Sequence, residues 1–312
     1  MDQLTAMRVF ARVVEAGTFT RAADTLKMPK PSVTKLVQGL EEHLQVKLLQ
    51  RTTRRVTVTP EGAAYYERTA RLLADLEDIE ADVSKAQTRP RGRLRVDAGS
   101  SVSNFLLIPA LPAFRAKYPD IQLELGVSDR SVDLVGDGVD CSIRGGVLPD
   151  QSLVARRIGE LEFLACATPA YLKRKGTPAH PTDLQEGHDI VSYFSTRTGR
   201  LIPLSFIPRE GERIDVMGRS SVAVNESTAH LSAVLAGLGV SQLPAFVARP
   251  HLDSGALVQV LDAWQGAPFP LFIVYPQNRH MSVKLRAFVD WTVELFAPFR
   301  PKREVAELAA RR

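Results

Sequence analysis

The side chains that could do chemistry gather in two patterns along the 312-residue chain. The first is a basic stretch in which lysine, hydroxyl and amide side chains lie close together, followed by three arginines. Its members are Lys30, Pro31, Ser32, Thr34, Lys35, Gln38, Arg51, Arg54 and Arg55. Cationic side chains reach phosphate oxygens, and short hydrogen-bonding side chains reach base edges in a major groove. This pattern indicates contact with a nucleic acid.

The second pattern consists of small polar residues and one arginine, in four places where a predicted strand meets a helix or turn. Its members are Ser100, Ser101, Ser103, Ser128, Arg144, Asn225, Ser227 and Thr228. Ligands of α/β sheets bind beyond the carboxyl ends of strands, where helix N-termini present free N–H groups. Such donors suit a small carboxylate. Two alternatives stay open: Ser101 or Ser227 is a plain helix cap, and Arg144 belongs to a structural ion pair.

Motifs for enzymatic chemistry are incomplete in the sequence. It has no H-E-x-x-H, no G-x-S-x-G and no G-x-x-x-x-G-K-[ST]. The stretches 136–138 and 237–239 lack the third glycine of a dinucleotide fingerprint, and the histidines lack metal-ligand spacing. We therefore expect no enzyme activity, no cofactor and no metal ion.

The two cysteines, Cys141 and Cys166, lie in apolar, strand-like runs outside any C-x-x-C pair. We interpret them as reduced core thiols, with a redox-sensing pair as the alternative. No apolar run reaches about 18 residues, and the first residues lack the signature of a signal peptide. These features predict a soluble, cytoplasmic protein without a membrane partner.

The net charge of the chain is unevenly distributed. Residues 1–60 contain ten Lys or Arg and five Asp or Glu, whereas residues 61–312 contain thirty of each. The whole net charge of +5 therefore lies in the first fifth of the chain. A small basic module attached to a neutral body is typical of nucleic-acid-binding proteins.

Helices and a hairpin must position the basic side chains. Apolar residues at helical spacing predict a first helix that ends at Gly17 and a third helix over residues 30–44. Their predicted core positions are Leu4, Met7, Phe10, Val13 and Val14 in the first, and Val33, Leu36, Val37, Leu40 and Leu44 in the third. A short second helix lies between them, and strands over 47–50 and 56–58 form a basic hairpin. Together these elements describe a winged helix-turn-helix; a solvated charged face on an ordinary helical bundle is the alternative.

The stretch from Phe10 to Gly62 resembles the DNA-binding domain of the LysR-type transcriptional regulators. Its most specific parts are "FTRAA", "PSVTKLVQGLE" and "LLQRTTRRVTVTPEG", with the gaps between them. By resemblance, the positions that contact DNA are Lys30, Pro31, Thr34 and Lys35, and the wing carries Arg51, Arg54 and Arg55. Where this family usually has Ser-Gln-Pro at the start of the recognition helix, the chain has Pro29, Lys30 and Pro31. The helix therefore loses a Ser cap, and the family's base preference is not carried over.

A long linker helix is predicted from residue 61 to about residue 86. Its apolar residues recur in steps of four and three, at Tyr65, Thr69, Leu72, Leu76, Ile79, Val83 and Ala86. A helix of this length needs a partner that buries such a stripe. We expect a two-helix coiled coil that makes a homodimer, and the resemblance adds that such dimers often pair into tetramers. The alternative is that the stripe packs on the chain's own domains.

From Gly92 onward, short apolar strands alternate with helical stretches, which predicts an α/β domain with largely parallel sheets. The predicted strands are 94–97, 121–127, 141–143, 154–158, 163–167, 190–193, 221–224, 239–243 and 271–275, and the helices are 104–117, 227–238 and 282–297. The signatures "DCSIRGG" and "AGLGVSQLP" resemble the effector-binding region of the same family, which is built like periplasmic solute-binding proteins. The resemblance implies two lobes, one over residues 92–160 and 268–300 and the other over 161–267.

The predicted fold is thus an N-terminal winged helix-turn-helix over residues 1–60, a linker and dimerisation helix over 61–89, and an α/β, two-lobed, periplasmic-binding-protein-like effector domain over 90–312. The predicted function is sequence-specific regulation of transcription, in which a small organic acid controls binding to double-stranded promoter DNA. The alternative is a small-molecule-binding or enzymatic α/β domain with a helical oligomerisation module. The concentration of charge in residues 1–60 favours the regulator. These patterns do not identify the effector, the regulated genes or the direction of regulation.

Overall fold

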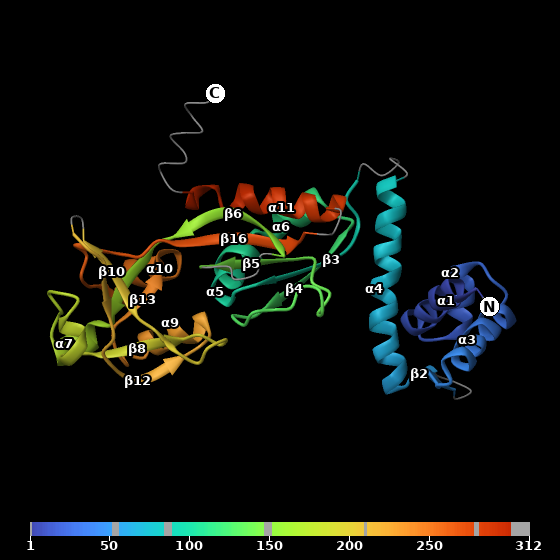
Figure 1. The fold of residues 1–312 in the computed structure, drawn as a ribbon, viewed down its shortest axis with the longest axis horizontal. Coiled ribbons are helices and arrows are strands. Elements are labelled where there is room, and N and C mark those ends of the chain that lie inside the picture. The colour runs from blue at the N-terminus through green and yellow to red at the C-terminus, as the bar shows by residue number, and fades with distance from the viewer. Residues whose placement is uncertain are drawn as a thin grey trace, which may run out of the picture. The chain divides into compact units, whose positions relative to one another are not determined.

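The computed structural model describes residues 2–51, 56–83, 89–146, 152–208, 211–277 and 281–300. The chain divides into two compact units, Met1–Thr88 and Arg89–Arg312, which we call the N-terminal and C-terminal units (Figure 1). Arg54, Arg55 and the tail 301–312 lie outside the described residues, as does the side chain of Arg51. Among the described helices, none is long and apolar enough to cross a membrane.

In its described part, the N-terminal unit consists of four helices and one hairpin (Figure 1). They are α1 (Gln3–Ala16), α2 (Phe19–Leu26), α3 (Lys30–Leu44), β1 (Leu49–Arg51), β2 (Val56–Val58) and α4 (Pro60–Val83). The hairpin is antiparallel, with Leu49 opposite Val58. The helix-turn-helix and wing predicted from the sequence are therefore present.

The residues at the helix ends explain why the three short helices stop and start where they do. Gly17 adopts a left-handed φ of 69° and its N–H donates to the carbonyl of Val13, which ends α1. Thr18 caps α2 because its hydroxyl oxygen accepts the N–H of Arg21 at 3.2 Å. Pro29 precedes α3 and supplies no side-chain cap, as predicted.

The core of the N-terminal unit lies between α1, α2, α3 and the start of the wing. Val33, Val37 and Leu40 of α3 are fully buried, as predicted. The prediction for α1 was wrong in part, because Leu4 is 37% exposed. The inner row of α1 is instead Ala6, Val9, Phe10 and Val13, which follows the i, i+3, i+4, i+7 spacing of one helix face.

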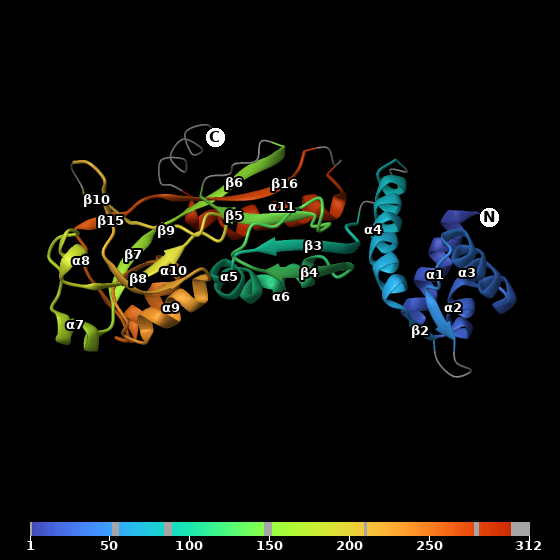
Figure 2. The ribbon, with the colours of Figure 1, turned by 60° about the horizontal axis from the view of Figure 1, so that its bottom comes forward.

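The long helix α4 packs on α1 within the N-terminal unit (Figure 2). The rings of Phe10 and Tyr65 have centroids 5.7 Å apart, and Thr69 is buried. The first part of the predicted coiled-coil stripe therefore packs on the chain's own unit, because α1 offers it an apolar face. Leu72 is different, since it is 54% exposed. The side chains of Ile79 and Val83, and all of Ala86, lie outside the described residues.

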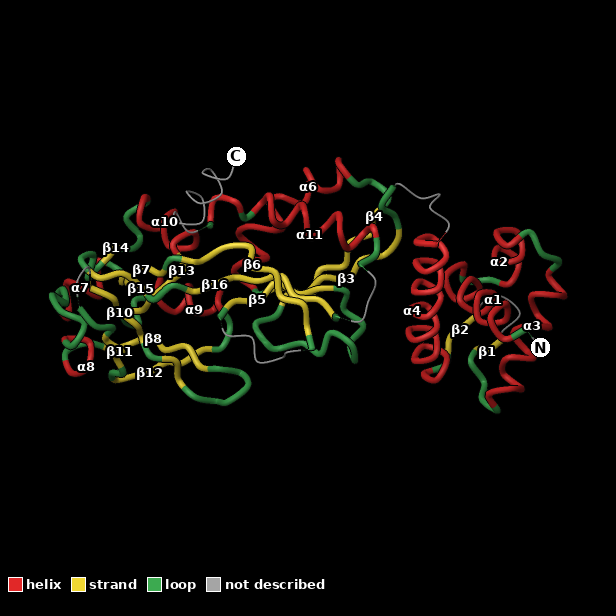
Figure 3. The backbone as a smooth tube through the Cα atoms, turned by 45° about the horizontal axis from the view of Figure 1, so that its top comes forward, coloured by secondary structure: helices red, strands yellow, loops and turns green. Residues whose placement is uncertain are grey.

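The C-terminal unit combines several small sheets with helices (Figure 3). Its strands are β3 (Gly92–Ala98), β4 (Ile121–Val127), β5 (Cys141–Gly145), β6 (Leu153–Leu161), β7 (Phe163–Ala167), β8 (Asp189–Phe194), β9 (Leu201–Ile202), β10 (Leu204–Pro208), β11 (Ile214–Val216), β12 (Arg219–Val224), β13 (Ser241–Pro244), β14 (Val258–Gln259), β15 (Trp264–Gly266) and β16 (Phe269–Pro276). Its helices are α5 (Ser100–Val102), the π-helical segment η1 (Ser103–Leu107), α6 (Ile108–Lys117), α7 (Pro169–Lys175), α8 (Asp183–Glu186), α9 (Ser227–Leu235), α10 (Ala245–Asp253), α11 (Val283–Leu295) and the short η2 (Ala297–Phe299).

We call the five-stranded sheet with α5, α6 and α11 lobe I, and the remaining sheets with α7 to α10 lobe II. The sheet of lobe I has the order β4-β3-β5-β16-β6, and lobe II contains the sheets β11-β10-β15, β12-β8-β9 and β13-β7-β14. Strand β16 returns to lobe I after the chain has passed through lobe II. The two lobes are therefore joined by more than one crossing of the chain.

The prediction of largely parallel sheets was wrong. Among the described strand pairs of the C-terminal unit, β3–β4, β3–β5 and β8–β12 are parallel, and the other pairs are antiparallel. Parallel pairing requires a long crossover, whereas β10 and β11 are separated only by residues 209–213. The predicted helix over 104–117 is also longer, because α5, η1 and α6 form one continuous helical run from Ser100.

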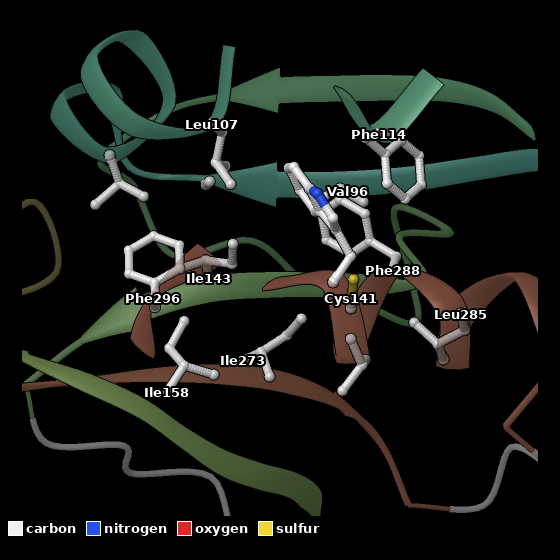
Figure 4. Packing of buried hydrophobic residues seen from close by; sticks show 14 of the residues in the cluster. Val96, Leu107, Phe114, Cys141, Ile143, Ile158, Ile273, Leu285, Phe288 and Phe296 are labelled. Carbon is white, nitrogen blue, oxygen red and sulfur yellow. The ribbon is translucent and has the colours of Figure 1, made fainter. Parts of the chain in front are cut away.

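Aromatic residues of α6 and α11 fill the core of lobe I (Figure 4). The ring of Phe114 lies 5.6 Å from that of Phe288 and 4.9 Å from that of Trp291, centroid to centroid. Cys141 is buried in this core, and Cys166 is buried in lobe II. Burial raises the pKa of both thiols, that of Cys166 to about 12.

We predict that Gly62→Ala destabilises the N-terminal unit, although Gly→Ala inside a helix ordinarily stabilises it by about 1 kcal/mol. A Cβ at Gly62 would lie 2.0 Å from the carbonyl oxygen of Leu48, so the wing or α4 has to shift. The expected loss is about 1–3 kcal/mol of unfolding free energy, measured by urea titration with far-UV circular dichroism. Both tryptophans, Trp264 and Trp291, belong to the C-terminal unit, so tryptophan fluorescence is an internal control that should not change. If Gly62→Ala made the N-terminal unit more stable, the expected clash with the carbonyl oxygen of Leu48 would be disproved.

Candidate nucleic-acid interface and effector site

The outer face of α3 carries the predicted nucleic-acid contacts. Lys30, Pro31, Lys35 and Gln38 are exposed, and Pro31, Lys35 and Gln38 follow the spacing of one helix stripe. Ser32 and Thr34 are half-buried at the border of this face. We call these six residues the α3 face. Exposed amide and ammonium groups on one side of a short helix can reach base edges and phosphates together.

The wing starts beside α3 and is held there by a residue that the sequence analysis missed. Glu41 is buried, and its Oε1 accepts the N–H groups of Leu48 and Leu49 at 3.0 and 3.1 Å. Its Oε2 accepts a hydrogen bond from Lys47 Nζ at 2.9 Å. The available signal was its position four residues after Val37, on the inner side of the helix.

The ionisation of Glu41 follows from these bonds. Burial by itself raises the pKa of Glu41, but the hydrogen bonds from Lys47 and from the N–H groups of Leu49 and Leu48 outweigh burial. The pKa of the carboxyl is therefore held below its ordinary value. Glu41 is thus a charged acceptor inside the N-terminal unit at neutral pH.

In the C-terminal unit, the N-termini of α5 and α9 meet between the lobes (Figure 2). The N–H of Ser101 donates to Ser227 Oγ at 2.9 Å. The carboxylate of Asp129 accepts the N–H of Ser100 at 2.7 Å with Oδ1 and the N–H of Ser227 with Oδ2. Asp129 therefore connects the first turns of both helices.

A second carboxylate, that of Glu226, acts at the same place. It is the N-cap of α9 and accepts the N–H groups of Thr228 and Ala229 at 3.0 and 2.6 Å. Burial by itself raises the pKa of Glu226, but hydrogen bonds from the Ser100 hydroxyl and from these first-turn groups lower it overall. Two acidic side chains thus neutralise the partial positive charge of the helix ends.

Tyr193 of β8 closes the group around Asp129. Its hydroxyl lies 3.2 Å from Asp129 Oδ2 and 3.0 Å from the carbonyl oxygen of Asn225. Burial raises the pKa of Tyr193, and the neighbouring charge of Asp129 adds to the effect. Behind it lies His230, whose Nε2 is 2.8 Å from Ser241 Oγ. Burial lowers the pKa of His230, so this ring is neutral near pH 7.

Arg144 forms the structural ion pair that the sequence analysis left open. Its guanidinium pairs with Asp97 and donates to the carbonyl oxygens of Ser128 at 2.7 Å and Arg130 at 2.9 Å. Burial raises the pKa of Asp97, and Arg144 acts in the opposite direction. Arg144 therefore ties β5 to β3 and to the turn after β4.

The structure separates the predicted effector residues into three groups. Ser100, Ser101, Ser227 and Thr228 lie together at the two helix ends, and Asn225 joins them through its carbonyl. Ser128 and Arg144 form the neighbouring group around Asp97. Ser103 is fully buried, with its hydroxyl 3.4 Å from the carbonyl of Ala98.

We call Ser100, Ser101, Asp129, Tyr193, Glu226 and Ser227 the interlobe cluster. Asp129 and Glu226 were missed although each lies in a polar stretch singled out from the sequence. The available signal was the preference of helix N-termini for acidic side chains. An anion can accept hydrogen bonds from the N–H groups at these helix ends only if the carboxylate of Asp129 or Glu226 first releases them.

Comparison with known proteins decides the family. Residues 4–63 match the model described as "bacterial regulatory helix-turn-helix protein, lysR family", and residues 87–297 match the LysR substrate binding domain. The chain is a LysR-type transcriptional regulator. This confirms the family and the two-part fold predicted from the sequence.

Individual relatives agree with this assignment. The LysR-type chain is 40% identical over 298 residues to an HTH-type transcriptional repressor of Pseudomonas aeruginosa, covering 95% of this chain and 93% of the relative. Among solved structures, it is similar to CrgA of Neisseria meningitidis, with 32% identity, a TM-score of 0.59, and 94% and 98% of the two chains covered. It is also similar to the full-length Vibrio cholerae virulence activator AphB, with 29% identity, a TM-score of 0.57, and 93% and 98% covered.

Membership settles the class of function. LysR-type regulators bind promoter DNA and small-molecule effectors, and they form oligomers. The similar proteins are named as transcriptional regulators, so this LysR-type chain is a regulator and not an enzyme.

Proposed function

We propose that this regulator binds a pseudo-palindromic promoter site in the cytoplasm, where the promoter DNA of bacteria lies. A small-molecule effector bound between the lobes changes the strength of that binding. The observation that carries the proposal is the α3 face, which presents Lys35 and Gln38 within residues 1–60, the stretch whose basic residues outnumber its acidic ones by five. Residues 61–312 contain equal numbers of basic and acidic residues, so the basic stretch that includes this face is where we expect polyanionic DNA to bind.

Within the α3 face, we propose that Thr34, Lys35 and Gln38 determine base preference, with Lys30 and Ser32 at the helix start supporting them. Arg51, Arg54 and Arg55 of the wing would supply affinity that is independent of sequence. Side chains on the outer face of a recognition helix, towards its N-terminus, reach base edges, whereas a basic hairpin beside it reaches phosphates.

We predict that Lys35→Ala weakens binding to a selected promoter site by about tenfold to a hundredfold more than binding to a mixed-sequence duplex. The site is first selected from random duplexes with the unchanged protein, and both affinities are then measured at one salt concentration. Lys173→Ala is the matched control, because it removes the same charge from an exposed position of the C-terminal unit. If the affinity for both duplexes fell by the same factor, Lys35 would contact phosphates and not bases.

We further propose that α4 pairs the N-terminal units of two chains. Leu72 supports this, because a leucine that is 54% exposed on a long helix is available to a second copy. Two half-sites one helical turn apart require two recognition helices that are held together.

We predict that Leu72→Glu lowers the dimerisation affinity at least about tenfold without unfolding the N-terminal unit, because a buried unpaired charge disfavours the interface. Sedimentation velocity over a concentration series measures it. Ala63→Glu is the control: it is also exposed, and it lies two and a half turns earlier, on the other side of the helix. If Leu72→Glu left the sedimentation profile unchanged, the proposal that α4 forms the dimer contact would be wrong.

For the effector, we propose a small carboxylate-bearing metabolite that replaces Asp129 as the acceptor for the interlobe cluster. Support comes from the N–H groups of Ser100 and Ser227, which already hold one carboxylate between them. Exchange of an internal carboxylate for a free one keeps these donors paired while releasing the contact of Asp129 with lobe II. Such an exchange couples effector binding to lobe arrangement, and hence to DNA binding.

We predict that Asp129→Asn tightens the binding of small organic acids, since the neutral amide competes less well for the two N–H groups. Thermal stabilisation by a panel of acids, compared with their neutral amides, measures the change. Asp262→Asn makes the same change of charge at an exposed position and should behave like the unchanged protein. If acids bound Asp129→Asn no more tightly, or if the amides gained equally, the exchange model would be wrong.

A further inference from the structure

We propose that Glu41 is a positioning residue for DNA binding, because its carboxylate holds the wing in place relative to the recognition helix α3. The inference rests on the proposed function of the N-terminal unit and adds a residue that does not itself reach DNA. Glu41 is 3% exposed, so it acts through the groups it binds.

The N–H groups at the start of the wing have Glu41 as their acceptor. Leu48 and Leu49 are buried, and both N–H groups have the Oε1 atom of Glu41 as acceptor, at 3.0 and 3.1 Å. A buried donor that loses its acceptor costs about 1–3 kcal/mol. The lowest-energy place for the first wing strand is therefore against the C-terminal half of α3.

The carbonyl group of Leu48 connects the wing to the start of α4. Its oxygen accepts the N–H of Thr59 at 3.0 Å, and the hydroxyl of Thr59 lies 3.1 Å from it. The same hydroxyl oxygen accepts the N–H of Gly62 at 2.9 Å, in the first turn of α4. Leu48 is therefore bound to α3 through its N–H and to the start of α4 through its carbonyl.

The wing is too short to keep its position without contacts to other elements. Its strands β1 and β2 have three residues each. A two-stranded hairpin is marginally stable in water without packing against another element. Two contacts at the open end of the hairpin stabilise it: Glu41 binds the start of the first strand, and Thr59 follows the second strand and binds back to Lys47.

The functional consequence follows from the sequence of the wing. The stretch 51–55 contains three arginines, and the proposed function assigns them to phosphates. A hairpin released from Glu41 loses its attachment to α3, and with it the support that we propose these arginines need to reach phosphates together with the α3 face. Fewer phosphates are then neutralised at once, and the dependence of affinity on salt becomes weaker.

The salt dependence separates this role from a purely structural one. Partial unfolding lowers the fraction of binding-competent protein and hence the apparent affinity, but it leaves the slope of log affinity against log salt unchanged. Loss of phosphate contacts changes the slope itself, by about 0.9 for each contact. The conservative variant adds a second criterion, because the amide oxygen of glutamine can accept both N–H groups as Oε1 does.

The experiment uses the full chain and a mixed-sequence DNA duplex, with affinity measured over a salt series. We expect Glu41→Ala to lower affinity at least about tenfold at low salt and to reduce the slope by about one to two. Glu41→Gln should keep the slope of the unchanged protein. Glu42→Ala is the matched control, because it removes the same charge from the exposed neighbour and should also keep the slope.

Each outcome decides between the roles. A slope that Glu41→Ala leaves unchanged, or that Glu41→Gln fails to restore, overturns the positioning role. If Glu41→Ala loses its helical circular dichroism, Glu41→Met takes its place, because it fills the space without an acceptor. Loss of fold in both overturns the proposal, since a residue that acts through the wing leaves α1 to α3 folded. If the unchanged protein shows no salt dependence, the proposed DNA binding fails instead.

Discussion

The carboxylate of Asp129 accepts the first N–H groups of α5 and α9, and these hydrogen bonds connect the two lobes where the helix ends meet. Helix N-termini carry unpaired donors and partial positive charge, so a half-buried carboxylate satisfies two of them at once. Ser227 repeats the connection in the other direction, because its hydroxyl oxygen accepts the N–H of Ser101. At the ends of α5 and α9, the contact between the lobes is thus made from polar groups that water, or a ligand, can also satisfy. Such a contact is easier to exchange than an apolar one.

The N-terminal unit solves a similar problem with a different outcome. There the donors belong to the wing, and the acceptor Glu41 is almost fully buried. Removing a buried acceptor leaves N–H groups that water cannot reach, so this junction is expected to persist while the interlobe cluster changes. In the proposed function, one chain therefore combines a lasting junction in its DNA-binding unit with an exchangeable one in its sensing domain. This difference in burial suits a regulator whose sensing domain has to respond while its DNA-binding unit keeps its shape.

The sequence predicted the order of elements well where periodicity was strong, as in α3 and in the strands around Cys141 and Ile121. It failed where pairing depends on residues far apart, so the antiparallel pairing of β16 with β5 and β6 was missed. In the candidate sites, the sequence indicated the residues that donate hydrogen bonds but not the carboxylates that accept them. Ser100 and Ser227 were singled out by type, whereas Asp129 matters only because the fold brings it to both helix ends. Arg144 could be paired with Asp97 only once β3 and β5 were neighbours.

The cysteines divide between the lobes, with Cys141 in β5 and Cys166 in β7. Each thiol is buried, and burial raises its pKa, so neither forms a reactive thiolate while its own sheet is closed. A thiol-specific reagent can react with either cysteine only when the lobe around it opens locally. The rate of this reaction therefore measures the free energy of local opening. With either cysteine replaced by alanine, the remaining one reports on a single lobe. The reaction rates of the two thiols can therefore show whether the two lobes of the sensing domain open together or independently.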